Sequence, residues 1–159
     1  MILAIDPGPE RSAYVLLKNG KPFESVIVDN ELLLERISPT RFLGLAKQMV
    51  IEGIESQGMA VGKETFTTCI WIGRFIEAWF DRRGETTEII YRSQVKMHLC
   101  GNLRAKDTNI RQALIDRYGP GKHKAVGLVT SKGPLYGIKS HCWQALAVGV
   151  TYFDTRVES

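Results

Sequence analysis

Apolar residues recur along the chain in short runs of strand length and in longer stretches with helical spacing. The short runs are rich in β-branched residues and end at turn-forming residues, which is typical of strands. They predict strands at residues 1–6, 13–18, 22–28, 48–54 and 87–92. Apolar residues three and four positions apart predict helices at residues 31–37, 65–82, 93–100, 105–118 and 140–154.

The connections between these elements indicate how the sheet is arranged. Asn19-Gly20 separates two of the early strands and is a strong hairpin signal, so these strands are expected to pair antiparallel. The later strands alternate with helices, which favours parallel pairing. The pattern therefore predicts an α/β fold: a mixed β-sheet with an antiparallel hairpin edge and parallel strands, flanked by helices. The basic segment 119–139 is rich in glycine and proline and is expected to be a mobile loop.

Composition predicts one soluble domain spanning residues 1–159. The chain is 44% hydrophobic and 24% charged, and its length is that of an ordinary single domain. No apolar run approaches the roughly 18 residues that a membrane span requires, and the first residues do not resemble a signal peptide. Three cysteines without a CxxC pair argue against a disulfide framework and a structural zinc site. We expect a cytoplasmic protein that does not bind a membrane.

Charge is unevenly distributed along the sequence. Residues 1–81 carry 8 Lys and Arg against 11 Asp and Glu, whereas residues 82–159 carry 13 against 6. This segregation indicates an acidic site on one part of the fold and a basic surface on another. A basic surface attracts the phosphate backbone of nucleic acids, although a modest excess of positive charge also serves solubility.

Three polar residues stand out against apolar surroundings. Asp6 ends the first strand, Glu52 interrupts an apolar strand and His141 opens the last helix. Singly, they have structural interpretations: an Asx-turn or helix cap, an ion pair and a hydrogen-bonded histidine. Together they would bring hard oxygen ligands and an imidazole toward the ends of sheet elements, as a Mg²⁺ or Mn²⁺ site requires.

Four segments resemble motifs of the RuvC family of Holliday-junction resolvases, which have a ribonuclease H-like fold. They are LAIDPGPERSAYVLL, VIEGI, YRSQVKMHLCGNLRAKDTNIRQALI and SHCWQALAVG, and they occur in the order of the family over nearly the whole chain. The GKETF segment is similar to phage or prophage members. The resemblance implies a cytoplasmic protein of a bacterium or of a phage-infected cell.

The resemblance assigns Asp6, Glu52 and His141 to metal-ligand positions. Gln144 falls where the family usually has a final aspartate, so it is a ligand position without the charge. Three interpretations follow from this departure. His141 and two carboxylates suffice, or another acid substitutes for the aspartate, or the enzyme is impaired. The candidate substitutes are Glu55 and Asp154.

The resemblance also implies a mechanism and partners. Lys96, Arg104 and Lys106 fall in a region that contacts DNA in the family, and the resemblance also implies a catalytic role for Lys106. The alternative without a function in DNA binding is that they are solvated side chains on a helix surface. The implied reaction is phosphodiester hydrolysis with two Mg²⁺ or Mn²⁺ ions per site. The implied partners are branched DNA and a second copy of the chain, for which the aromatic residues of helix 65–82 are a candidate interface.

The sequence thus predicts a metal-dependent, structure-selective DNA endonuclease that resolves Holliday junctions. The alternative is a branched-DNA-binding module of the same fold with impaired catalysis. An actin-like phosphotransferase also begins with a strand, an Asp-x-Gly turn and a hairpin. That class needs a further glycine-rich phosphate loop and usually a second subdomain, for which 159 residues leave no room.

Overall fold

The computed structural model describes residues 1–37, 45–56, 58, 60–83 and 85–157. Five strands form the main sheet: β1 (Ile2–Asp6), β2 (Arg11–Lys18), β3 (Lys21–Asp29), β4 (Gln48–Gly53) and β5 (Glu88–Tyr91). The longer helices are α1 (Asn30–Ile37), α2 (Lys63–Arg83), α3 (Arg92–Cys100), α4 (Asp107–Tyr118) and α6 (Cys142–Tyr152), which continues into the π-helical turn η1 (Phe153–Val157). No helix among these residues is long and apolar enough to cross a membrane.

The sheet has the strand order β3-β2-β1-β4-β5 and is mixed, as predicted. β1, β2 and β3 pair antiparallel, whereas β1 pairs parallel with β4, and β4 with β5. Asn19 and Gly20 both have positive φ values, 51° and 71°, which is the backbone of a tight two-residue hairpin turn. This turn fixes the antiparallel edge that the sequence predicted.

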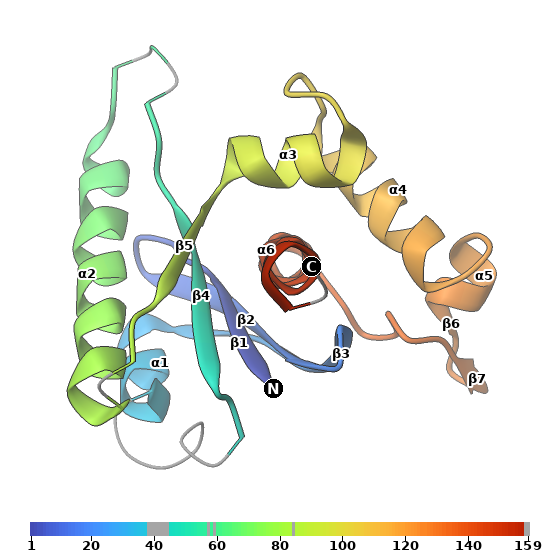
Figure 1. Cartoon of the computed structure of the whole chain (residues 1–159), viewed down its shortest axis with the longest axis horizontal. Helices are drawn as coiled ribbons and strands as arrows, with labels where there is room; N and C mark the ends of the chain where they lie inside the picture. The colour runs from blue at the N-terminus through green and yellow to red at the C-terminus, as the bar shows by residue number, and fades with distance from the viewer. Residues whose placement is uncertain (38–44, 57, 59, 84, 158–159) are drawn as a thin grey trace.

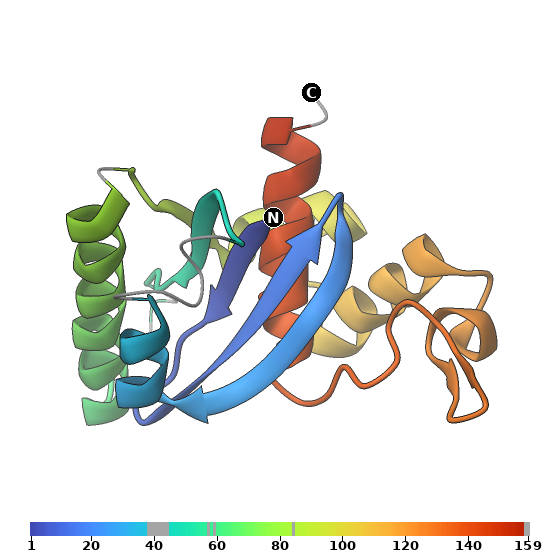
Figure 2. The same cartoon turned by 90° about the horizontal axis from the view of Figure 1, so that it is seen from below.

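Helices cover both faces of the sheet (Figures 1 and 2). Alternate residues of a strand point to opposite faces, so each face of the sheet has its own core. Leu3 and Ile5 of β1 pack toward α1 and α2, whereas Ile2 and Ala4 pack toward α6, α3 and α4. Because α6 is buried between the sheet and the outer helices, its first residues are held at the edge of the sheet where β1 ends.

The expected loop at residues 119–139 contains short regular elements. They are α5 (Lys122–Ala125) and a two-stranded ribbon of β6 (Gly127–Leu128) and β7 (Ser131–Lys132). Ala125 and Leu135 are fully buried and join this segment to the core beside α6. Four residues of helix and two-residue strands are too short to give a periodic pattern, so the sequence could not reveal them.

Candidate functional site

Two carboxylates lie side by side where adjacent parallel strands end. Ile5 of β1 is in register with Ile51 of β4, so the following residues, Asp6 and Glu52, are neighbours at the same edge. Ala4 and Val50, two positions earlier, belong to the core beneath α6, and the period of two places both acidic side chains on that same face. The two carboxyl groups are close enough to hydrogen-bond to each other.

Burial makes this pair of carboxylates electrostatically unusual. The side chains of Asp6 and Glu52 are each only 14% exposed. Loss of solvation raises the pKa of both groups, and the negative charge of Asp6 raises that of Glu52 further, whereas the positive charge of Arg92 opposes the rise. An uncompensated pair of buried carboxylates is costly, so this site favours a bound cation or a retained proton.

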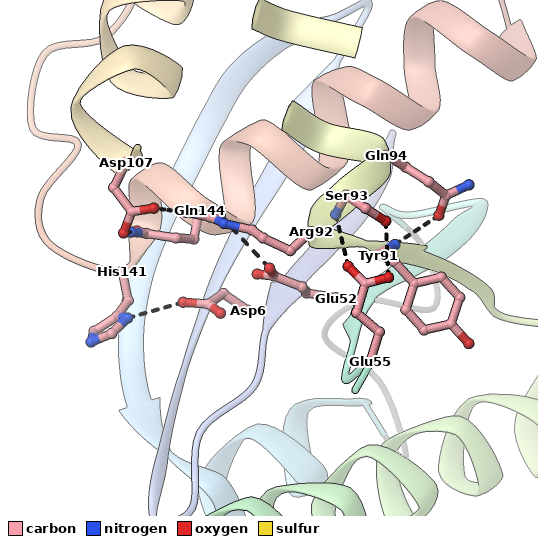
Figure 3. Close-up of polar contacts among 10 residues, drawn as sticks. All are labelled: Asp6, Glu52, Glu55, Tyr91, Arg92, Ser93, Gln94, Asp107, His141 and Gln144. Atoms are coloured by element: carbon pink, nitrogen blue, oxygen red, sulfur yellow. Dashed lines mark hydrogen bonds and ion pairs between the residues drawn. The ribbon is translucent and has the colours of Figure 1, made fainter. Parts of the chain in front are cut away.

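His141 stands beside Asp6 at the start of α6 (Figure 3). Its Nδ1 lies 3.1 Å from Asp6 Oδ2, and its side chain is 69% exposed. The backbone carbonyl of His141 accepts hydrogen bonds from the N–H groups of Gln144 and Ala145, which makes His141 the N-terminal cap residue of α6. The backbone of His141 is therefore fixed at the start of α6, whereas its imidazole ring is open to solvent.

Two charged residues that the sequence analysis did not single out complete the cluster. Arg92 is the first residue of α3, and its guanidinium Nη1 lies 3.7 Å from Glu52 Oε1. Its Nη2 forms an ion pair with Oδ1 of Asp107, the first residue of α4. Arg92 directly follows β5, whose carboxyl end meets that of β4 at the same edge. The position of Arg92 directly after a parallel strand could have identified it from the sequence. Asp107 could not be identified in this way, because it resembles an ordinary acid in the first turn of a helix.

Gln144 lies within the cluster. Its Nε2 donates a hydrogen bond of 3.2 Å to Asp107 Oδ2, whereas its Oε1 is buried without a hydrogen-bond partner among the described residues. Together with Asp6, Glu52, Arg92 and His141, it lines a cavity of about 340 Å³. Gln144 thus faces the acidic site from the position that the resemblance assigned to a metal ligand.

Neither acid considered as a substitute for Gln144 lines this cavity. The carboxylate of Glu55 accepts hydrogen bonds of 2.9 Å from the backbone N–H and from the hydroxyl of Ser93, toward which it turns in Figure 3. Asp154 lies beyond the opposite end of α6, where it pairs with His98 and Arg117. The acid closest to Gln144 in the cluster is Asp107, which the sequence analysis did not consider.

The three predicted DNA-contacting residues lie on the α3–α4 side of the site. Lys96 is half-buried on α3, and Arg104 is exposed in the connection between α3 and α4. Lys106 is exposed and immediately precedes Asp107, and its backbone N–H donates a hydrogen bond to Asn109 Oδ1 at the start of α4. Lys106 thus directly precedes a residue of the acidic cluster in the sequence, whereas Lys96 and Arg104 lie four residues after Arg92 and three residues before Asp107.

The donor set matches the chemistry of a divalent-cation site, although the side chains are not arranged around one position. Carboxylate oxygens with an imidazole suit Mg²⁺ and Mn²⁺. Across the part of the chain that the structure describes, no three acidic, histidine or cysteine side chains have the spacing of a formed metal site. The guanidinium of Arg92 instead contacts Glu52 and Asp107.

Solved structures of RuvC share this arrangement of strands and helices. RuvC of Thermus thermophilus superposes with a TM-score of 0.62 and 18% identity, over 95% of this chain and 92% of that chain. RuvC of the same organism in complex with a Holliday junction substrate gives a TM-score of 0.63 and 16% identity, over 95% and 90%. The chain has the RuvC fold.

This RuvC-like fold confirms the predicted ribonuclease H-like class. No family model and no curated protein matches the sequence. The likeness therefore rests on the arrangement of strands and helices, because fewer than one residue in five is identical.

Proposed function

We propose that this protein is a divalent-metal-dependent endonuclease that cleaves branched DNA, with the Holliday junction as its substrate. The observation that carries the proposal is the pair of buried carboxylates, Asp6 and Glu52, at the edge where β1 and β4 end in a chain with the RuvC fold. One of the solved RuvC structures holds a Holliday junction substrate, which supports the same class of ligand here.

The metal ligands in this proposal come from two strands and one helix. Asp6 and Glu52 supply carboxylate oxygens, His141 supplies a ring nitrogen and Gln144 an amide oxygen, for Mg²⁺ or Mn²⁺ and for two ions per site. Bound divalent ions would lower the pKa of a water nucleophile and offset charge on the phosphate. The orphaned Oε1 of Gln144 and the raised pKa values of both carboxyl groups support a cation at this position.

The basic residues of the proposed enzyme hold the DNA. Lys106 is exposed and directly precedes Asp107 in the sequence, which supports a contact of its ammonium group with a phosphate oxygen near the scissile bond. There it stabilises the negative charge that develops as water attacks phosphorus and the 3′-oxygen leaves. Lys96 and Arg104 contact phosphates farther along the strand, and such contacts position DNA without reading its sequence.

The second candidate function is a branched-DNA-binding module with impaired catalysis. Gln144 favours it, because an amide brings no charge to the ligand position, and so does Arg92, whose guanidinium already contacts Glu52 and Asp107. Incubation of the wild-type chain with labelled four-way junctions in Mg²⁺ and in Mn²⁺ separates the two functions. Binding without nicking in either metal supports the module, and the absence of junction binding contradicts both.

Asp6→Asn is the sharpest test of the endonuclease. Asp6 is a buried member of the cluster, whereas phosphate contacts come from the basic second half of the chain. We therefore expect this variant to lose cleavage by at least about 100-fold while its affinity for junctions stays within about twofold. Asp116→Asn is the matched control, since Asp116 is an exposed acid on α4. Retained nicking by Asp6→Asn at saturating Mg²⁺ contradicts the assignment.

We further propose that the enzyme acts as a homodimer through α2. Of the aromatic residues predicted for this interface, Phe75 and Trp79 are buried in the core of the chain itself. Phe66 and Phe80 are 60% and 50% exposed, and Ile70 between them is 65% exposed. A dimer would cover these apolar side chains and present two active sites to the symmetric strands of a junction.

A further inference from the structure

Gln144 carries no carboxylate of its own, but it holds the carboxylate of Asp107 at the site by a hydrogen bond. Its Nε2 donates to Oδ2 of Asp107, so the amide on α6 is linked to an acid on α4. Asp107 and Gln144 line the same cavity as Asp6 and Glu52. The negative charge that an acid at position 144 would supply is thus present at the same edge, brought there by a different helix.

Asp107 is well placed to interact with the two buried carboxylates. It is the first residue of α4, where the helix N-terminus stabilises a negative charge. Its charge is close enough to raise the pKa of both Asp6 and Glu52. Unlike them, its side chain is 65% exposed, so Asp107 lines the cavity and is also open to solvent.

Arg92 shows that a cation is stabilised between these acids. Its guanidinium contacts Glu52 on one side and Asp107 on the other, and its side chain is only 17% exposed. Nη1 is buried and finds no hydrogen-bond acceptor among the described residues. One positive charge faces three carboxyl groups, so a divalent cation would neutralise the cluster more completely than Arg92 does.

We propose that Asp107 supplies the third carboxylate of the divalent-cation site, with Gln144 as its positioning residue. The guanidinium of Arg92, which forms ion pairs with Glu52 and Asp107, is displaced when the cation binds. This inference rests on the proposed function, because it adds a ligand to the same site. It resolves the departure at position 144 by relocating the acid from α6 to α4.

Binding of Mn²⁺ to the full chain, without DNA, tests the inference. Free Mn²⁺ is measured by its electron paramagnetic resonance signal during titration of the wild-type protein and variants. Asp107→Asn is expected to raise the dissociation constant by at least about tenfold. Asp116→Asn, the exposed acid on the same helix, is expected to leave it unchanged. Equal affinities of Asp107→Asn and the wild type would overturn the inference.

Asp6→Asn keeps this result separate from the proposed function. If Asp6→Asn abolishes Mn²⁺ binding and Asp107→Asn does not, the inference fails and the proposed metal site stands. If Asp6→Asn binds Mn²⁺ as the wild type does, the proposed site itself fails.

Two further variants distinguish a ligand from a residue that only holds the fold together. Returning the acid to α6, in the double variant Asp107→Asn with Gln144→Asp, is expected to restore affinity to within about threefold of the wild type. Arg92→Gln removes the competing cation and is expected to lower the dissociation constant severalfold. If the double variant does not regain its affinity for Mn²⁺, or if Arg92→Gln binds Mn²⁺ more weakly than the wild type, the inference is overturned. Asp107 would then only hold Arg92 in place through their ion pair.

Discussion

At the scale of single residues, the site follows from the cost of burying charge. Asp6 and Glu52 could be predicted as special from sequence, because an isolated acid in or at the end of an apolar strand must be paired, protonated or bound to a cation. Arg92 and Asp107 sit at the starts of helices among other polar residues, where a charge is ordinary. Their role depends on which helix ends meet at the sheet edge, and this is a property of the tertiary structure.

The burial of Glu52 predicts a dependence of stability on pH. Loss of solvation, followed by the charge of Asp6, raises its pKa from the usual 4.5 to about 8 in the folded chain. Between these values the folded state holds a proton that the unfolded state releases, so the free energy of unfolding decreases as the pH rises through this range. The loss approaches about 1.4 kcal/mol per pH unit for one such group.

Glu52→Gln removes that group and isolates its effect. We expect the stability of the variant to depend less steeply on pH than that of the wild type between pH 6 and 8, and the variant to be the more stable protein at pH 8. Urea unfolding at several pH values, in a chelator to exclude divalent cations, measures both slopes. Parallel pH profiles of the two proteins would show that Glu52 titrates normally.

At the scale of elements, the position of α6 decides where the site forms. The helix approaches β1 and β2 closely because Gly149 has no side chain: a Cβ there would lie 2.5 Å from Leu17 Cδ1 and 2.8 Å from Ala4 Cβ. The sequence predicted this helix from its apolar composition. It could not show that Gly149 faces the sheet, because nearly every residue of α6 is apolar and small side chains occur on several of its faces.

Gly149→Ala is therefore expected to destabilise the protein, although alanine is the better helix former. Overpacking a rigid core costs about 1–3 kcal/mol, which exceeds the roughly 1 kcal/mol that alanine gains in a helix. Gly73→Ala in α2 is the matched control, because its Cβ would meet no atom within 4 Å. Urea unfolding should rank the proteins as Gly73→Ala, wild type and Gly149→Ala in decreasing stability, and a stabilised Gly149→Ala would contradict the close packing.

At the scale of the whole molecule, the chain combines an acidic cavity with a predominantly basic second half. The mixed sheet with an antiparallel hairpin edge, and the helices that flank it, could be predicted from sequence, because hairpin signals and apolar periodicity are local. The order of the strands in the sheet was not predicted. The cluster could be predicted only in part. Asp6, Glu52, His141 and Gln144 were identified, whereas the pairing of Arg92 with Asp107 arises from contacts between elements distant in sequence.

The basic half of the molecule predicts that junction binding weakens with salt. Lys106→Ala removes one proposed phosphate contact, so affinity should fall alike for junctions of every sequence. The slope of log K against log salt concentration is negative and should become about 0.9 less steep. Lys18→Ala is the control, because Lys18 lies at the hairpin turn, at the end of the sheet away from Asp6. If both the salt dependence and the cleavage rate are unchanged in Lys106→Ala, Lys106 does not contact the phosphate and is an ordinary solvated lysine on the surface.

The exposed apolar side chains of α2 lead to a prediction about the assembly. Ile70 and Phe66 are one helical turn apart and largely exposed, so a charge at position 70 would be buried in the proposed dimer and solvated in a monomer. Ile70→Glu is therefore expected to halve the mass measured by light scattering during gel filtration, without lowering the melting temperature of the monomer. Phe23→Glu is the matched control, since Phe23 on β3 is 61% exposed and lies outside α2. A wild-type chain that elutes as a monomer at all concentrations would contradict the dimer. So would an Ile70→Glu variant that keeps the mass of a dimer.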